Sequence, residues 1–126
     1  MPNRIDVTLT RLRDSGEQAL APFLTVGFPD VPTSEALALA ALEAGADMLE
    51  LGIPFSDPLA EGPTIQMTSY RALQNGVTLD TVLDVVARLR ASQPRAPVIL
   101  IGCSETPMGC GVSSESTHSR AAPLRP

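Results

Sequence analysis

The sequence lacks several features that would point to particular classes of protein. It has no tryptophan, no lysine, 3% aromatic residues and two cysteines among its 126 residues. Its positive charge therefore comes from arginine, and the formal net charge is −5. The arginines are scattered rather than gathered in a stripe, so the electrostatic footprint of a nucleic-acid-binding protein is missing. We expect an acidic protein whose partners do not include nucleic acid.

Long apolar runs are missing as well. The best of them, Ala36 to Leu42, stops at Glu43, well short of the roughly 18 residues that a membrane helix needs. The start, Met1 to Asp6, has no apolar core of the kind found in signal peptides. We therefore predict no membrane association and a cytoplasmic location, where a reducing environment would keep Cys103 and Cys110 as thiols.

The spacing of apolar residues predicts helices that alternate with strands. We expect helices at residues 4–15, 33–44, 64–74 and 78–93, and strands at residues 19–26, 47–51 and 98–101. Alternation of this kind favours parallel strands joined by right-handed helical crossovers. It indicates an α/β fold, and it does not choose between a layered sheet and a segment of a barrel.

Two helix starts carry capping residues. Thr33 or Ser34 can cap the second helix, and Thr78 can cap the last one, with Val77 and Val82 as a hydrophobic staple at its entry. The apolar spacing of the last helix predicts a buried face, made of Leu79, Val82, Leu83, Val86 and Leu89.

The character of the chain changes after Gly102. Residues 103–126 contain five serines, three prolines and two glycines, and no helical or strand period is visible there. We predict two parts, a folded domain at 1–102 and an irregular tail at 103–126. Cys103, Cys110 and His118 of the tail are spaced seven and eight residues apart, which matches no common zinc arrangement, so we predict no metal site.

Carboxylates gather around the end of the second predicted strand. If Leu49 and Leu51 face the covering helices, Glu50 faces the other side of the sheet, where a low dielectric favours the protonated form. A carboxyl in that setting can give and take a proton. The alternative is that Glu50 binds a neighbouring backbone group or an arginine. Asp57 and Glu61 follow in the loop, where solvated acids are the ordinary interpretation.

The segment around Glu50 is the most specific in the chain. It reads Met48-Leu49-Glu50-Leu51-Gly52-Ile53-Pro54-Phe55-Ser56-Asp57-Pro58-Leu59-Ala60-Glu61-Gly62-Pro63-Thr64-Ile65-Gln66. It resembles, nearly residue for residue, the tryptophan synthase alpha-subunit motif Leu-Glu-Leu-Gly-(Ile/Val)-Pro-Phe-Ser-Asp-Pro-Leu-Ala-Asp-Gly-Pro-x-Ile-Gln. The similarity extends to residues 22–30, 44–47 and 98–102.

The resemblance implies a fold and an activity. The fold is a (β/α)8 TIM barrel, of which this chain would hold an N-terminal helix and the first three β/α units. The activity is that of a lyase of tryptophan biosynthesis, the retro-aldol cleavage of indole-3-glycerol phosphate into indole and glyceraldehyde 3-phosphate. The family works in a heterotetramer with the beta subunit, which receives the indole.

Residue roles follow from the match in the same way. Glu50 falls on the family's acid/base carboxylate, and Glu61 falls on the second carboxylate, which holds the indole N–H. Phe23 falls on a residue that packs against the indole ring. Pro54 and Asp57 fall in the loop that contacts the beta subunit.

The resemblance implies no cofactor for this chain. Pyridoxal phosphate in this enzyme belongs to the beta subunit, and its Schiff base requires a lysine. The lack of lysine also argues against a Schiff-base aldolase mechanism, which leaves carboxylate acid/base chemistry.

The chain departs from the family pattern at two points. The family has Asp where this chain has Glu61, which moves the charge by on the order of 1.5 Å, and a misplacement of about 1 Å can cost roughly a hundredfold in rate. A TIM barrel also needs about 250 residues. We therefore expect a truncated or frameshifted member whose unclosed sheet leaves Phe23, Met48, Ile99 and Ile101 uncovered. The alternative function is an inactive fragment that retains at most binding to the beta subunit.

Overall fold

The computed structural model describes residues 1–56, 61–103 and 110–114. Helices and strands alternate along most of the chain, as the apolar spacing predicts. In order, the elements are α1 (Arg4–Ser15), β1 (Phe23–Thr25), α2 (Val31–Glu43), β2 (Leu49–Gly52), α3 (Pro63–Gln74), α4 (Leu79–Ser92), β3 (Val98–Cys103) and β4 (Cys110–Ser114).

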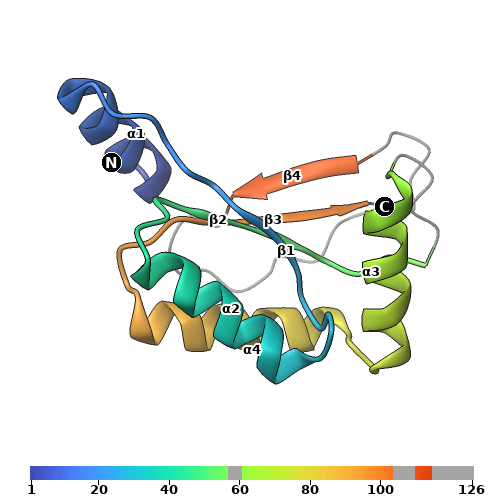
Figure 1. Cartoon of the computed structure of the whole chain (residues 1–126). Helices are drawn as coiled ribbons and strands as arrows, with labels where there is room; N and C mark the ends of the chain where they lie inside the picture. Colours follow the sequence, from blue (N-terminus) through green and yellow to red (C-terminus); the bar gives the residue numbers. More distant parts are fainter. Residues whose placement is uncertain (57–60, 104–109, 115–126) are drawn as a thin grey trace.

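The strands form one sheet in the order β1-β2-β3-β4. β1 pairs with β2 and β2 pairs with β3, both in parallel, which confirms the predicted α/β architecture. Helices α2 and α4 lie together along one face of the sheet, α3 stands near the carboxyl ends of the parallel strands, and α1 lies at the opposite end (Figure 1). The carboxyl ends of β1 to β3 therefore meet at one edge, next to α3.

The fourth strand was not predicted. The sequence indicated no strand after Gly102, and this is wrong for Cys110–Ser114, which pairs with β3 in the antiparallel direction. The edge of β3 offers N–H and C=O groups that need partners, so a segment without a period of its own can bind there. The division of the chain at residue 102 itself stays a prediction.

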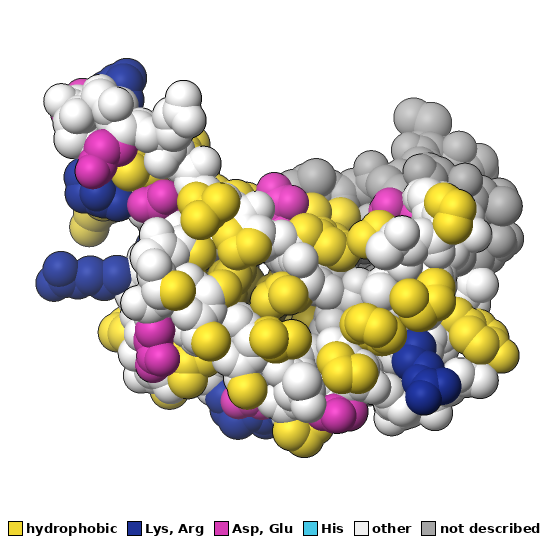
Figure 2. Space-filling model, viewed as in Figure 1, with side chains coloured by type: hydrophobic (Ala, Val, Ile, Leu, Met, Phe, Trp, Pro, Cys, Tyr) yellow, Lys and Arg dark blue, Asp and Glu magenta, His cyan; other side chains and the backbone are white. Residues whose placement is uncertain are grey.

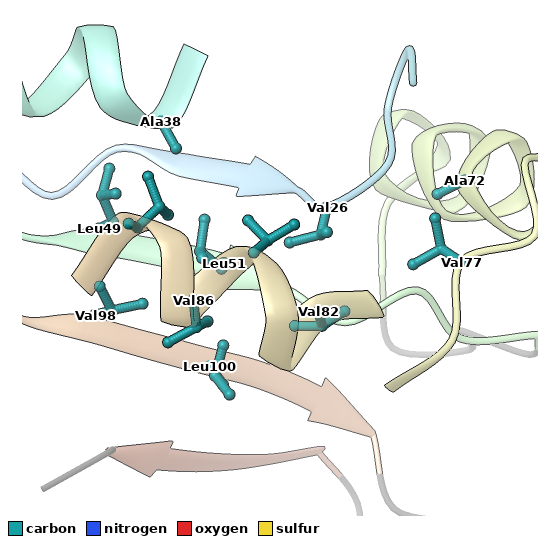
Figure 3. Close-up of a cluster of buried hydrophobic side chains, with 12 residues drawn as sticks. Val26, Ala38, Leu49, Leu51, Ala72, Val77, Val82, Val86, Val98 and Leu100 are labelled. Carbon is teal, nitrogen blue, oxygen red and sulfur yellow. The ribbon is translucent and has the colours of Figure 1, made fainter. Parts of the chain in front are cut away.

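The hydrophobic core lies between the sheet and the two helices α2 and α4. Leu49 and Leu51 of β2 are 0% and 1% exposed, and both point towards α4 (Figure 3). They pack in one cluster with residues of the neighbouring strands and helices, among them Val26, Ala38, Val82, Val85, Val86, Leu89, Val98 and Leu100. Burying one such side chain contributes about 1.5–3 kcal/mol, so this face holds the fold together.

The buried face of α4 differs from the predicted one by a small rotation. Val82, Val86 and Leu89 are buried as predicted, and Val85 is buried with them. Leu79 and Leu83 were predicted to be buried, but they are 55% and 39% exposed. The stripe that contacts the sheet is centred between Val82 and Val85, which leaves the row of Leu79 and Leu83 at its border.

The start of α2 and the length of β1 also differ from the prediction. Asp30 caps α2, with its carboxylate accepting a hydrogen bond from the Thr33 N–H at 2.8 Å. Ser34 instead accepts a bond from the Gly27 N–H at 2.9 Å. β1 has three residues instead of eight, because Pro22 has no N–H with which to continue the ladder.

Large apolar side chains remain exposed on the outer helices. In Figure 2 they are spread over the region of α2, α3 and α4, with charged side chains between them. The most exposed of these on the three helices are Leu37, Met67, Tyr70, Leu79 and Leu83. Among the described residues, no helix is both long enough and apolar enough to cross a membrane.

Candidate active site

Glu50 lies on the face of the sheet opposite to the core. Its neighbours Leu49 and Leu51 are buried against the helices, and side chains alternate between the two faces of a strand. In register, Glu50 lies between Phe23 of β1 and Ile99 of β3, so the three side chains form a row across the inner face. Glu50 is half-buried, and its register partners on the two neighbouring strands are both hydrophobic.

The backbone of Glu50 is fixed by the sheet. Its N–H donates to the Pro22 C=O at 3.0 Å. Within the part of the chain that the structure describes, the Glu50 carboxylate has no hydrogen-bond or ion-pair partner, so neither an arginine nor a backbone N–H accounts for its position.

The inner face is less exposed than the sequence predicted. Met48 is only 5% exposed, so the prediction that it lies uncovered is wrong. Phe23, Ile99 and Ile101 are half-buried. Long side chains in neighbouring strands cover one another on one face of a sheet even before a barrel closes.

Phe23 lies against the end of β2. A Cβ atom placed on Gly52 would lie 2.6 Å from Cζ of the Phe23 ring, a distance that a side chain cannot tolerate. Glycine at position 52 therefore allows the Phe23 ring to cross over the backbone of β2. The ring is held at the carboxyl end of the strands, where a barrel of this kind places its chemistry.

Phe23 and Glu61 share a small hollow at that end of the sheet. The hollow has a volume of about 20 Å³, and its lining residues are Phe23, Gly52, Ile53, Phe55, Glu61, Ile65, Ser69, Ile101 and Gly102. Glu50 is not part of this lining. A volume of this size holds about one water molecule, so this hollow is too small for an indole-sized ligand.

Glu61 is placed by the start of α3. The Gln66 side-chain amide donates to the Glu61 C=O at 2.8 Å, and the Gln66 N–H donates to the Gly62 C=O at 3.0 Å. The sequence did not single out Gln66, although it belongs to the motif. The signal for Gln66 is an amide side chain in the first turn of a helix, from which it can reach back to the preceding loop.

A second polar contact joins β1 to α3. The hydroxyl groups of Thr25 and Thr68 are 2.8 Å apart, and both residues are buried. Thr68 also donates to the Ile65 C=O at 3.0 Å. The contact fixes the helix that follows Glu61 against the strand that carries Phe23. Nothing local in the sequence predicts it, because the two threonines are 43 residues apart.

The remaining predicted residues are placed only in part. Pro54 is half-buried directly after β2, and Asp57 lies outside the described residues. The same is true of His118 and of the side chains of Cys103 and Cys110. Among the described residues, no group of three or more His, Cys, Asp or Glu side chains could hold a metal ion.

These features define a class of protein. The chain is a parallel α/β unit whose core lies under the helices and whose carboxylates lie on the opposite face and at the carboxyl ends of the strands, which is the arrangement of an enzyme of the TIM-barrel type. The chain belongs to the tryptophan synthase alpha chain family, since the model of the family described as "Tryptophan synthase alpha chain" matches residues 9–118.

Relatives agree with this assignment. The chain is 54% identical over 100 residues to the tryptophan synthase alpha chain of Chloroflexus aggregans, covering 79% of this chain and 38% of the relative. It is 45% identical over 120 residues to that of Laribacter hongkongensis, covering 95% and 46%. The crystal structure of tryptophan synthase subunit alpha from Legionella pneumophila superposes with a TM-score of 0.80 at 44% identity, covering 82% of this chain and 39% of that chain.

The chain thus spans less than half the length of these relatives. The family match also continues past Gly102, to residue 118. The structural neighbours are TIM-barrel proteins of this family, and this chain corresponds to their amino-terminal part.

Proposed function

We propose that this chain supplies the acid/base residues of the tryptophan synthase alpha reaction. That reaction is the retro-aldol cleavage of indole-3-glycerol phosphate into indole and glyceraldehyde 3-phosphate. The observation that carries the proposal is the position of Glu50. It is a half-buried carboxylate without a partner among the described residues, on the inner face, between Phe23 and Ile99. The family membership supplies the reaction.

In this proposal Glu50 moves protons between the glycerol hydroxyl group and C3 of the indole. Glu61 accepts a hydrogen bond from the indole N–H and stabilises the positive charge that develops on the ring. Phe23 packs against the ring from the side of β1. Its placement next to Glu61 in one hollow supports a common binding site for the indole part of the substrate.

The partner in this proposal is the beta subunit of tryptophan synthase. Pro54 and Asp57 belong to the loop after β2, at the carboxyl end of the strands, where a product leaving the site would emerge. The loop would contact the beta subunit and pass indole to it, in the cytoplasm. We propose no cofactor and no metal for this chain.

The test is an indole-release assay with added beta subunit. Glu50→Gln preserves the shape of the side chain and removes its acid/base function, so we expect any indole release to fall by roughly 10²–10⁴-fold. Glu43→Gln, at the exposed end of α2, is the matched control and should leave the rate unchanged. Equal rates for the two variants would contradict the role of Glu50.

A second function is favoured by the size of the hollow next to Glu61. The hollow has room for about one water molecule. We therefore propose as the alternative a fragment without turnover that binds the beta subunit through the loop at Pro54 and Asp57, and that aggregates when isolated. Retention by immobilised beta subunit without indole release favours this alternative, whereas a monomeric sample that releases indole excludes it.

A further inference from the structure

The edge of β3 is the place where a fourth parallel strand would join the sheet. β3 is a continuous apolar strand of six residues, Val98–Cys103, and a TIM barrel continues on this side by adding parallel strands. A strand edge of this length is also a template for pairing with another chain. What occupies the edge therefore determines what the chain can bind there.

The backbone groups of β3 that face this edge can be identified. The Leu49 N–H donates to the Pro97 C=O at 3.0 Å, and the Ile53 N–H donates to the Ile101 C=O at 2.8 Å. Odd-numbered residues of β3 thus direct their backbone groups to β2. Because these groups alternate along a strand, Leu100 and Gly102 direct theirs to the other side.

β4 is aligned with these two residues. Leu100 is opposite Ser113, and Gly102 is opposite Gly111, in antiparallel register. Each of these two pairs can exchange two N–H···O=C bonds. Figure 1 shows β4 along the outer edge of β3 and running in the opposite direction. The backbone groups of Leu100 and Gly102, which a fourth parallel strand would need, are therefore already used by β4.

We propose that β4 is an edge-blocking strand, which prevents the addition of any further strand to β3. In this arrangement β4, a later segment of the same chain, forms the last strand of the sheet. It runs antiparallel to β3, whereas the next strand of a TIM barrel would run parallel to it. A second copy of the chain and a separate polypeptide carrying later strands of the barrel are both excluded from this edge as long as β4 is paired.

Two proline variants of the full chain test this proposal. Ser113→Pro removes an N–H that faces β3, whereas Val112→Pro removes an N–H that faces away from it, where an edge strand tolerates proline. Hydrogen exchange is measured at the Leu100 and Gly102 amides, which face β4. The Leu49 and Ile53 amides, which donate across the β2–β3 pairing, are the internal reference.

We expect the Leu100 and Gly102 amides to exchange at least tenfold faster in Ser113→Pro than in the wild type, with the reference amides unchanged. Sedimentation velocity at equal concentrations should show a shift to larger species in Ser113→Pro relative to the wild type. Val112→Pro should behave like the wild type in both measurements.

Three outcomes would overturn the proposal. The first is wild-type exchange at Leu100 and Gly102 as fast as in an unstructured chain. The second is faster exchange in Ser113→Pro without any increase in association. This would show that β4 pairs with β3 but is not what prevents another strand from binding there. The third is loss of protection at Leu49 and Ile53 as well, because β4 would then be part of the folding core and not an added edge.

Discussion

The two faces of the sheet differ in what they contain. The face under α2 and α4 is fully packed, with Leu49, Leu51 and Val82 between 0% and 1% exposed. The opposite face has a half-buried row of Phe23, Glu50 and Ile99. The first face is packed by residues of this chain, whereas the second carries Glu50, the carboxylate on which the proposed function depends.

The difference explains how less than half of a barrel keeps a recognisable structure. The helices that cover a β/α unit come from the same stretch of sequence as its strands, so the outer core is built locally. The inner face of a barrel is shared among all eight strands, and the described residues of this chain contribute three parallel strands. The stability of the fold therefore comes from the face covered by helices. The proposed site on the inner face depends on the residues that lie across from it in a barrel.

The largest expected effect comes from removing a side chain from the packed face. Leu51→Ala leaves a cavity in the helix-covered core and should lower the free energy of unfolding by about 2–5 kcal/mol. Ile99→Ala, on the half-buried inner face, should cost less than half as much. Urea unfolding followed by circular dichroism measures both values.

The same pair of variants can break the comparison. If Ile99→Ala destabilises the protein as much as Leu51→Ala, the inner face contributes to the core as strongly as the outer one. The separation of a stabilising face from a chemical face would then be wrong.

A somewhat smaller effect is expected at the turn after β1. Gly27 has a φ of +93°, and a Cβ at this position would lie 2.2 Å from Cγ2 of Val77, a core residue. Gly27→Ala adds overpacking to backbone strain and should cost about 2–4 kcal/mol. Gly45→Ala is the matched control, since Gly45 has a φ of +114° and no atom within 4 Å of its Cβ position.

Gly45→Ala should therefore show the backbone strain alone, about 1–2 kcal/mol. The difference between the two variants in thermal unfolding measures how tightly the packed face extends to the end of β1. Equal losses would mean that Val77 moves aside without cost, and that packing there is looser than the distance indicates.

The sequence predicted best what depends on neighbouring residues. The predicted Thr78 cap is confirmed. It could be predicted because its partner, Thr81, lies only three residues further along the chain. The orientation of Glu50 also follows from its neighbours, since Leu49 and Leu51 need burial. At α2, by contrast, Asp30, Thr33 and Ser34 all suit a helix start, and the sequence favoured the wrong ones.

Long-range contacts could not be predicted. The bond between Thr25 and Thr68 joins residues 43 positions apart, and neither residue carries a local sign of it. The pairing of Cys110–Ser114 with β3 depends on an unoccupied edge rather than on any pattern in the tail. Both contacts arise from the three-dimensional arrangement, which a period in the sequence does not encode.

The smallest expected effect lies at the exposed border of the packed face, where Asp30 caps α2. The backbone N–H of Thr33 donates a hydrogen bond to the Asp30 carboxylate, and this bond, with a lesser contribution from the Thr33 side chain, holds the pKa of Asp30 below its usual value. A carboxylate whose pKa is lowered by folding stabilises the folded state at pH values above its pKa in the unfolded chain, about 3.9. The contribution is lost as the pH falls through the lowered pKa of the folded state.

Asp30→Asn retains a capping side chain and removes the titrating charge. Urea unfolding between pH 7 and pH 3 should therefore show a shallower loss of stability on acidification in Asp30→Asn than in the wild type. Asp84→Asn, at an exposed position within α4, should follow the wild-type curve. If Asp30→Asn and the wild type lose stability in parallel, the cap acts through its hydrogen bond alone, and the border of the packed face owes nothing to the charge of Asp30.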